Sequence, residues 1–294
     1  MEKMKFLIIG GDMRQIFLAI ALKNAGHYVA AVYINCDICE KEGIALYDSV
    51  SAAITDCDVV ILPLPFAGNV EHLNTPLWDG IVGIKEIFLN LGLHKEKIIV
   101  GGMIDKNSRI LADKYGLTIT DYLEREEFAV LNAIATAEGA ISIAIDEMSV
   151  NIHSCNAVVL GFGRIGKLLC KDLKALSANV VSAARKKSDL AWIKANNYEA
   201  VTYSKLEYKL FDADVIFNTV PQLILNKNLL KLLKKDCLII DLASKPGGVD
   251  FNAAALLGIN TVWALSLPGK VSPVSSGKIL MDTILNIVDE ISVG

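Results

Sequence analysis

The chain has 294 residues, of which 53% are hydrophobic and 21% are charged, and its formal net charge is −4. This length allows two domains of ordinary size, and the apolar content supports large buried cores rather than disorder. The sequence contains no long basic run, which argues against the electrostatic surface that nucleic-acid-binding proteins need. We therefore expect no nucleic-acid partner.

The longest apolar stretch, Phe128–Ile145, is the nearest candidate for a membrane span. It contains Asn132 and Glu138 and follows a charged run over residues 124–127. A span needs about 20 mostly apolar residues in succession, so we predict instead a helix buried between domains, and no membrane partner. The N-terminus enters a strand pattern directly and shows no signal peptide, which predicts a cytoplasmic protein.

Cysteine and histidine provide no convincing metal site. Cys36 and Cys39 form a lone CxxC pair among six cysteines, and no second pair or histidine follows at a suitable spacing. A zinc site needs four such ligands. We interpret the cysteines as reduced thiols and predict no metal.

Short apolar runs alternate with helix-like stretches along the whole chain, which is typical of parallel βαβ units. Gly, Pro, Asn and Asp separate almost all of these runs and predict turns between them. The predicted strands are Met4–Gly10, Tyr28–Tyr33, Asp58–Leu62, Lys97–Gly101, Leu117–Thr120, Asn156–Leu160, Asn179–Ala183, Asp214–Asn218, Leu238–Asp241 and Asn260–Trp263.

The two halves of the chain resemble copies of one another. Gly10 aligns with Gly161, and residues 56–65 align in the same order with residues 212–221. Chance explains such an ordered match poorly. We infer an α/β fold with two Rossmann-like domains, each a doubly wound parallel sheet with helices on its faces.

The domain boundaries follow from these patterns. Residues 1–124 are predicted to form an N-terminal Rossmann-like substrate domain, which a C-terminal helix over residues 275–294 completes. Residues 125–150 are apolar on most faces and predict a long buried helix that joins the domains. Residues 151–274 form the predicted NAD(P)-binding domain. Because such folds bind ligands at the carboxyl ends of their strands, we expect the ligands in a cleft between the domains.

The strongest single motif is the GxGxxG loop made of Gly161, Phe162, Gly163, Arg164, Ile165 and Gly166. A buried strand pattern precedes it and a helix pattern follows it, as a dinucleotide site requires. Gly161 permits a tight turn, Gly163 lets the backbone approach a pyrophosphate, and Gly166 lets helix and strand pack closely. The free N–H groups and the dipole of the helix then favour the phosphates. An empty glycine turn is the less favoured alternative.

The residues after the next strand favour NADP over NAD. An NAD site usually has an acidic residue near Ala184, whereas this chain has Arg185, Lys186 and Lys187. A ribose 2′-phosphate needs charged donors, and an arginine provides a planar pair of them. A solvated basic turn is the alternative, and NAD remains possible. The predicted cofactor set is completed by Ala184 and by residues at the following strand ends, Thr219, Val220, Pro221, Ala243 and Ser244.

The matching turn of the first half, residues 10–15, departs from the motif. Gln15 stands where the third glycine would be, so a dinucleotide is not expected there. Asp12 and Arg14 lie in this turn, and we predict that the turn and Arg14 hold a small anionic substrate.

Three further segments, 124–139, 241–251 and 267–277, carry polar residues where strands should end. Together, and in this order, they resemble the family of the A-type subunit of dipicolinate synthase, which belongs to spore-forming bacteria. Residues 10–15 resemble it too, so that the resemblance covers essentially the whole chain.

The resemblance implies an oxidoreductase of sporulation in the mother-cell cytoplasm. It would form dipicolinate (pyridine-2,6-dicarboxylate) from a dihydrodipicolinate or hydroxytetrahydrodipicolinate precursor, with hydride transfer to NADP. It also implies a flavoprotein-like partner, the B-type subunit of dipicolinate synthase, and we further expect a homodimer. The small dicarboxylate substrate needs cations. We assign Glu138 and Lys245 as catalytic, and the substrate-binding residues as Asp12, Arg14, Arg125, Thr136, Lys270 and Ser276.

Two other functions stay open. The first is another two-domain dehydrogenase related to alanine dehydrogenase or the 2-hydroxyacid dehydrogenases. The latter use a late histidine as acid and base, whereas the last histidine here is His153, before the glycine loop. The second is a cofactor-binding regulatory protein whose partner carries the chemistry. Glu138, inside an apolar helix, needs a partner or a proton and so favours a role in catalysis.

Overall fold

The structure of the protein is a computed structural model that describes residues 2–293. The chain divides into two compact units. The first unit runs up to Leu131 and resumes at Ser272, and the second unit comprises Asn132–Val271. Each unit contains a six-stranded parallel sheet, and the strands of each sheet are ordered 3-2-1-4-5-6 by their position in that unit. This order is that of a Rossmann fold, which confirms the predicted fold class.

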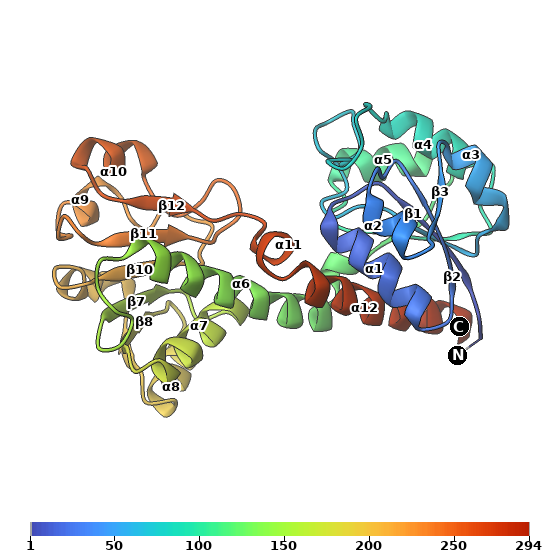
Figure 1. The fold of residues 1–294 in the computed structure, drawn as a ribbon. Coiled ribbons are helices and arrows are strands. Elements are labelled where there is room, and N and C mark those ends of the chain that lie inside the picture. The colour runs from blue at the N-terminus through green and yellow to red at the C-terminus, as the bar shows by residue number, and fades with distance from the viewer. Residues whose placement is uncertain (1, 294) are drawn as a thin grey trace. The chain divides into compact units, whose positions relative to one another are not determined.

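The first unit carries helices on both faces of its sheet (Figure 1). Its strands lie in the spatial order β3-β2-β1-β4-β5-β6. In chain order its elements are β1 (Lys5–Ile9), α1 (Met13–Asn24), β2 (Tyr28–Val32), α2 (Asp37–Lys41), β3 (Ala45–Tyr47), α3 (Val50–Ala53), β4 (Val59–Ile61), α4 (Ile84–Leu91), β5 (Ile98–Gly101), α5 (Lys106–Lys114), β6 (Ile119–Asp121) and, from the end of the chain, α12 (Pro273–Val293).

The second unit repeats this plan, with the spatial order β9-β8-β7-β10-β11-β12. A short 3-10 helix, η3, replaces the α-helix that would connect its third and fourth strands. Its elements are β7 (Asn156–Leu160), α7 (Arg164–Ala175), β8 (Asn179–Ala183), α8 (Lys187–Ala195), β9 (Glu199–Val201), η3 (Tyr203–Lys209), β10 (Val215–Asn218), α9 (Lys227–Leu230), β11 (Leu238–Asp241), α10 (Phe251–Leu257), β12 (Thr261–Trp263) and α11 (Leu267–Val271).

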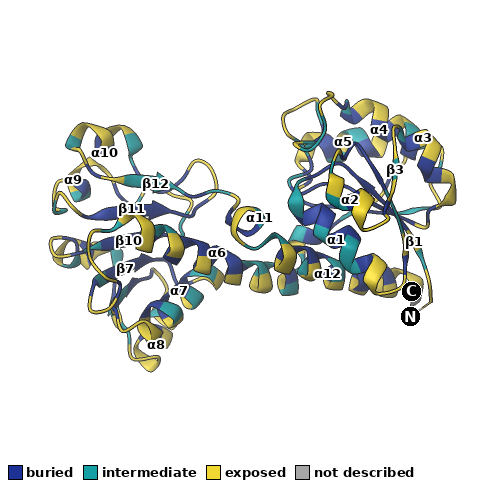
Figure 2. Ribbon diagram, in the orientation of Figure 1, coloured by how far each residue is buried: buried dark blue, intermediate teal, exposed yellow. Residues whose placement is uncertain are grey.

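The central strands are buried on both faces, which Figure 2 shows in dark blue. Residues Leu7–Ile9 and Val158–Leu160 are all within 1% of complete burial. Their continuous apolar runs are typical of parallel sheets, because helices cover both faces of such sheets. The ten predicted strands are all present. Two of the four edge strands, β3 and β9, were not predicted; each has three residues, at least one of which is exposed, and so shows no apolar run.

The C-terminal helix α12 packs along α1 in the first unit. Gly277 permits this close approach, since a Cβ atom there would lie 2.6 Å from the backbone nitrogen of Leu18. A larger residue would push the two helices apart.

The connecting helix α6 (Glu126–Glu147) begins in the first unit and continues into the second. It is long and apolar enough to cross a membrane by length and composition, yet half of its apolar window is buried inside the protein. Core helices of soluble proteins share this property. The prediction of burial on all sides was too strong, because Ile134 and Ile145 are exposed.

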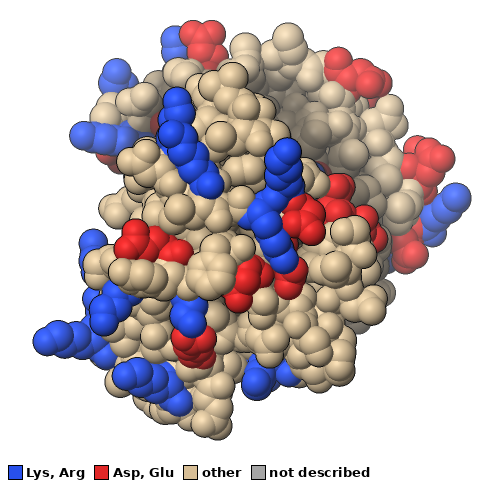
Figure 3. Space-filling view, turned by 90° about the vertical axis from the view of Figure 1, so that its left-hand side faces the viewer, with Lys and Arg blue, Asp and Glu red and all other residues tan. Residues whose placement is uncertain are grey.

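On the face drawn in Figure 3, positively and negatively charged side chains are interspersed, and lysine and arginine lie next to aspartate and glutamate.

Candidate nucleotide-binding site

The turn between β7 and α7 is tightly built around Gly161. This residue has φ +98°, and a Cβ atom there would lie 2.4 Å from Oγ1 of Thr219. The Thr219 hydroxyl in turn donates a hydrogen bond of 2.8 Å to the Leu160 carbonyl. Only glycine fits this position, because both the backbone conformation and the close side chain exclude a Cβ atom.

Gly163 and Gly166 have opposite surroundings. A Cβ atom on Gly166 would lie 2.2 Å from the Gly161 carbonyl oxygen, so α7 packs directly on the turn. A Cβ atom on Gly163 would meet nothing within 4 Å, which leaves the start of α7 open. Gly163 is also the N-cap of α7 and supplies no side-chain cap, and the first turn holds no acidic residue. Backbone N–H groups and the helix dipole therefore suit a phosphate at this place.

Phe162 contributes to packing rather than to an exposed surface. It is 6% exposed, and its ring makes an edge-on contact with Tyr198 at a centroid distance of 6.5 Å. Its neighbours Gly163 and Arg164 are exposed, and Ile165 is half-buried. The open side of the loop is thus formed by backbone near Gly163.

The basic turn follows β8. Ala184 is buried, and its N–H donates to the Val201 carbonyl at 3.1 Å, whereas Arg185 and Lys186 are exposed. Burial raises the pKa of the nearby Tyr203 phenol, and the positive charge of Arg185 opposes this shift. The guanidinium therefore stands on the surface with Tyr203 as a neighbour.

Two residues that the sequence analysis did not assign, Asn218 and Asp241, are fully buried at the ends of β10 and β11. The amide of Asn218 donates to a carboxylate oxygen of Asp241 at 2.7 Å. The other predicted cofactor residues surround this pair in the chain: Thr219 and Val220 are half-buried, Pro221 and Ser244 are exposed, and Ala243 is buried. Polar residues that end two neighbouring buried strands are the signal that could have identified the pair.

The glycine turn of the first unit is closed by the protein itself. The Gly11 N–H donates to the Asn74 carbonyl at 2.9 Å, and a Cβ atom on Gly10 would lie 2.6 Å from Thr75 Cγ2. Gln15 is fully buried beneath the turn, and its side-chain oxygen accepts from the Asp12 N–H at 3.1 Å. The Gly11 N–H is therefore already bonded within the protein, and Gln15 fills the position that the third glycine takes in a dinucleotide site.

Asp12 and Arg14 already bind one another. The Asp12 carboxylate caps α1 and pairs with the Arg14 guanidinium at 2.8 Å. Arg14 also donates to the Leu64 carbonyl at 2.5 Å, and its side chain is only 6% exposed. The geometry differs from the predicted anion site, because these contacts use the guanidinium within the protein.

Arg125 is likewise engaged. It binds Glu290 of α12 through two nitrogens, at 2.6 and 2.7 Å, and Glu127 at 2.7 Å. These hydrogen bonds hold the pKa values of both glutamates below their usual range. Ser276 is buried in the same helix at 2% exposure. Arg125 and Ser276 thus lie where α12 is anchored in the first unit.

The remaining assigned residues belong to the second unit. Lys245 and Lys270 are exposed. Thr136 is buried, and its hydroxyl donates to the Asn132 carbonyl within α6 at 3.1 Å. Glu138 is exposed on the same helix, so the expected burial of its carboxylate is absent. The described residues contain no cluster of potential metal ligands.

Comparison with known proteins identifies the chain. Residues 5–123 match the family of the N-terminal domain of the A-type subunit of dipicolinate synthase, and residues 133–253 match the NAD-binding domain of the D-isomer-specific 2-hydroxyacid dehydrogenases. The A-type subunit of dipicolinate synthase from Bacillus subtilis (strain 168) is 30% identical over 98% of this chain and 97% of its own length. The chain belongs to this family of A-type dipicolinate synthase subunits.

Two solved structures of this family agree with the assignment. The A chain of dipicolinate synthase from Bacillus subtilis superposes with a TM-score of 0.87 and 29% identity, covering 100% of this chain and 98% of that one. Its counterpart from Bacillus halodurans gives a TM-score of 0.84 at 29% identity, covering 97% of both chains. The second unit is therefore a nucleotide-binding domain of the dehydrogenase type, as the glycine loop predicted.

Proposed function

We propose that this chain oxidises a partly reduced, cyclic pyridine dicarboxylate precursor to dipicolinate and passes the hydride to NADP. The observation that carries the proposal is the open, uncapped start of α7 at Gly163, in a chain that belongs to this family. From a dihydro precursor, loss of one hydride to NADP and one proton makes the ring aromatic; a hydroxytetrahydro precursor loses one water molecule in addition. This gain supplies driving force, so the reaction needs no strong base.

The cofactor would be held by the backbone N–H groups of the 161–166 loop and by the loops that follow β8, β10 and β11. When bound, NADP supplies a hydride acceptor. The two carboxylates of the substrate call for cations, and Lys245 and Lys270 are exposed and able to pair with them. Arg14 and Arg125 are weaker candidates, because each is already bound to carboxylates.

Glu138 is the proposed acceptor of the substrate proton or the partner of a substrate-binding cation. Its exposure leaves the carboxylate accessible. Replacing Glu138 with Gln keeps the shape and removes the charge. We expect slower turnover at saturating substrate; a variant with unchanged turnover would remove Glu138 from the mechanism.

The proposed preference for NADP rests on Arg185 and Lys186, which are exposed directly after β8. In the double variant Arg185→Asp and Lys186→Ser, we expect the ratio of kcat/KM for NADP to that for NAD to fall by about a hundredfold, since two charged contacts are lost. Lys194→Ser, in the last turn of the helix that follows, α8, is the matched control. An unchanged ratio in the double variant contradicts the assignment.

We further propose that the chain works in the mother-cell cytoplasm with a flavoprotein-like B-type subunit of dipicolinate synthase, and that it also forms a homodimer. The test combines purified chain, this partner, precursor and NADP, and follows reduced cofactor together with the ultraviolet absorbance of dipicolinate. Joint appearance of both signals supports the reaction. Omission of the partner distinguishes a catalytic chain from a regulatory one, and light scattering of the chain alone tests the homodimer.

A further inference from the structure

We propose that Asp241 and Asn218 form a positioning pair, which holds the loops after β10 and β11 in the arrangement that binds cofactor and presents Lys245. This inference rests on the proposed function. It concerns residues that contact neither substrate nor cofactor themselves, because both side chains are fully buried.

The Asp241 carboxylate collects three donors. One oxygen accepts from the Asn218 amide at 2.7 Å and from the Ala243 N–H at 3.0 Å, and the other accepts from the Gly248 N–H at 2.8 Å. The carboxylate therefore fastens the first and last parts of the 242–248 loop to the end of β11. Hydrogen bonds to an ionised, buried acceptor are among the stronger ones in proteins.

Asn218 extends this arrangement to the neighbouring loop. Its amide nitrogen also donates to the Val220 carbonyl at 3.0 Å, and its oxygen accepts from the Val220 N–H at 3.2 Å. Thr219 and Val220, which belong to the proposed cofactor set, are thus held by the residue that binds Asp241. The two loops are joined through side chains that the solvent does not reach.

The glycines of the Lys245–Gly248 segment fit this network closely. A Cβ atom on Gly248 would lie 2.3 Å from the Asn218 amide nitrogen, and one on Gly247 would lie 2.9 Å from an Asp241 oxygen. The Gly248 carbonyl accepts from the N–H groups of Ile224 and Leu225 at 2.9 and 3.0 Å. The backbone reaches the buried carboxylate only because side chains are absent here.

An amide cannot replace the Asp241 carboxylate. All three partners are donors, and an asparagine would direct its own N–H₂ group at one or two of them. Asp241→Asn therefore keeps size and shape but leaves buried donors facing one another. We expect the 242–248 loop to loosen while the sheet beneath it stays intact.

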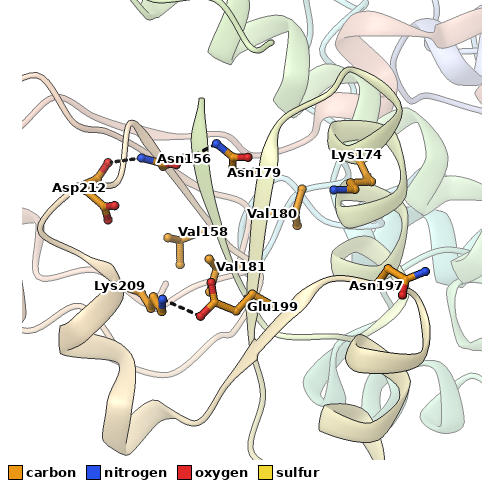
Figure 4. A pocket seen from close by; sticks show the side chains of 10 residues that line it. All are labelled: Asn156, Val158, Lys174, Asn179, Val180, Val181, Asn197, Glu199, Lys209 and Asp212. Atoms are coloured by element: carbon orange, nitrogen blue, oxygen red, sulfur yellow. Dashed lines mark hydrogen bonds and ion pairs between the residues drawn. The ribbon is translucent and has the colours of Figure 1, made fainter. Parts of the chain in front are cut away.

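A matched control lies at the opposite, amino ends of the same strands. Asp214 accepts from the Asn156 N–H at 2.7 Å and pairs with Lys234. Its partner Asn156 lines a polar pocket of about 280 Å³ at the amino ends of the strands, in which Lys209 pairs with Glu199 and Asn179 donates to Asn156 (Figure 4). Asp214→Asn makes the same chemical change far along the strands from the loops.

The experiment compares Asp241→Asn, Asn218→Ala and Asp214→Asn in the full chain. Hydrogen exchange of cofactor-free protein follows the amides of Ala243 and Gly248, and calorimetry measures NADP binding. Steady-state kinetics then separates KM from kcat. We expect faster exchange and about a tenfold weaker binding and higher KM for NADP in Asp241→Asn, with the same direction and a smaller size in Asn218→Ala. Asp214→Asn should lower only the Tm.

Equal exchange at Ala243 and Gly248 in Asp241→Asn and Asp214→Asn overturns the positioning pair. So does a KM for NADP that stays within about twofold of the unaltered chain in a folded variant. If Asp241→Asn does not fold, the criteria of NADP binding and KM apply to Asn218→Ala, because that variant leaves the Ala243 and Gly248 N–H groups with their acceptor. Failure of the unaltered chain to bind NADP defeats the proposed function, whereas unchanged exchange defeats only the positioning pair.

Discussion

The two units contain the same strand–turn–helix at the start of their sheets, and they use it differently. In the first unit the Asn74 carbonyl accepts from Gly11, and Gln15 fills the space under the turn. In the second unit Gly166 takes the position of Gln15, and a Cβ atom added to Gly163 would meet nothing within 4 Å. One turn is closed by its own chain, and the other is open.

From this difference we infer which part of the glycine motif matters for the proposed ligand site. Both turns have left-handed glycines after the strand, Gly10 with φ +60° and Gly161 with φ +98°. Since we expect a nucleotide only in the second unit, we infer that the tight turn alone does not make a nucleotide site. We infer that an uncapped helix start is needed as well; in the first unit the Asp12 carboxylate caps α1.

The largest effect is expected from a substitution of Gly166, whose close contact with Gly161 holds the glycine turn of the second unit in place. Gly166→Ala puts a methyl group 2.2 Å from the Gly161 carbonyl oxygen, which is backbone and cannot rotate away. We expect a loss of about 3 kcal/mol or more in unfolding free energy, together with loss of NADP binding. Denaturant unfolding and calorimetry measure the two quantities. Normal stability and binding would show that the third glycine is not needed.

Disruption of the glycine turn of the first unit should not affect nucleotide binding at the turn of the second unit. Arg14→Met removes the cation that pairs with Asp12 and the donor to the Leu64 carbonyl, at a cost of about 2 kcal/mol in stability. The Kd for NADP should stay unchanged, because the nucleotide turn belongs to the other unit. Asp12→Asn offers a comparison, since it keeps the cap and weakens the pair. If Arg14→Met leaves stability intact but raises the KM for substrate, Arg14 is a substrate residue after all.

The open position can be filled without disturbing the fold. Gly163→Ala meets no neighbouring atom and keeps φ −81°, so stability should change by no more than about 1 kcal/mol. The new methyl group would stand where a pyrophosphate approaches the backbone, and NADP binding should weaken about tenfold. Binding as tight as in the unaltered chain would place the phosphates elsewhere.

The sequence was most informative where a pattern reports a backbone requirement. The central strands and the glycine loop could be predicted because apolar runs and glycine spacing reflect burial and close packing. The short edge strands β3 and β9 could not, since each includes exposed residues and has no apolar run. Charged residues were the least predictable part of the site. Arg14 and Arg125 look like substrate ligands in the sequence, and only the fold reveals that Asp12 pairs with Arg14 and Glu290 with Arg125.

Arg125 pairs with Glu127 and with Glu290 of α12, and we call these two ion pairs the clamp. The smallest expected effect concerns this clamp, and it depends on pH. Arg125 lowers the pKa values of Glu127 and Glu290 below the ordinary value of 4.5, mainly through its hydrogen bonds. A carboxylate with a lowered pKa in the folded state stabilises the fold above its unfolded pKa, and this contribution is lost as the pH falls through the folded value. Arg125→Met should therefore lower the Tm slightly at pH 7 and lose less stability than the unaltered chain when both are acidified below about pH 4.5. Glu290 is exposed and Arg125 and Glu127 are partly exposed, so the difference should also shrink in high salt. If the stability difference between the two proteins is the same at every pH, the clamp contributes nothing. If the difference disappears on acidification and the Kd for NADP is unchanged, the role of the clamp is confined to the first unit.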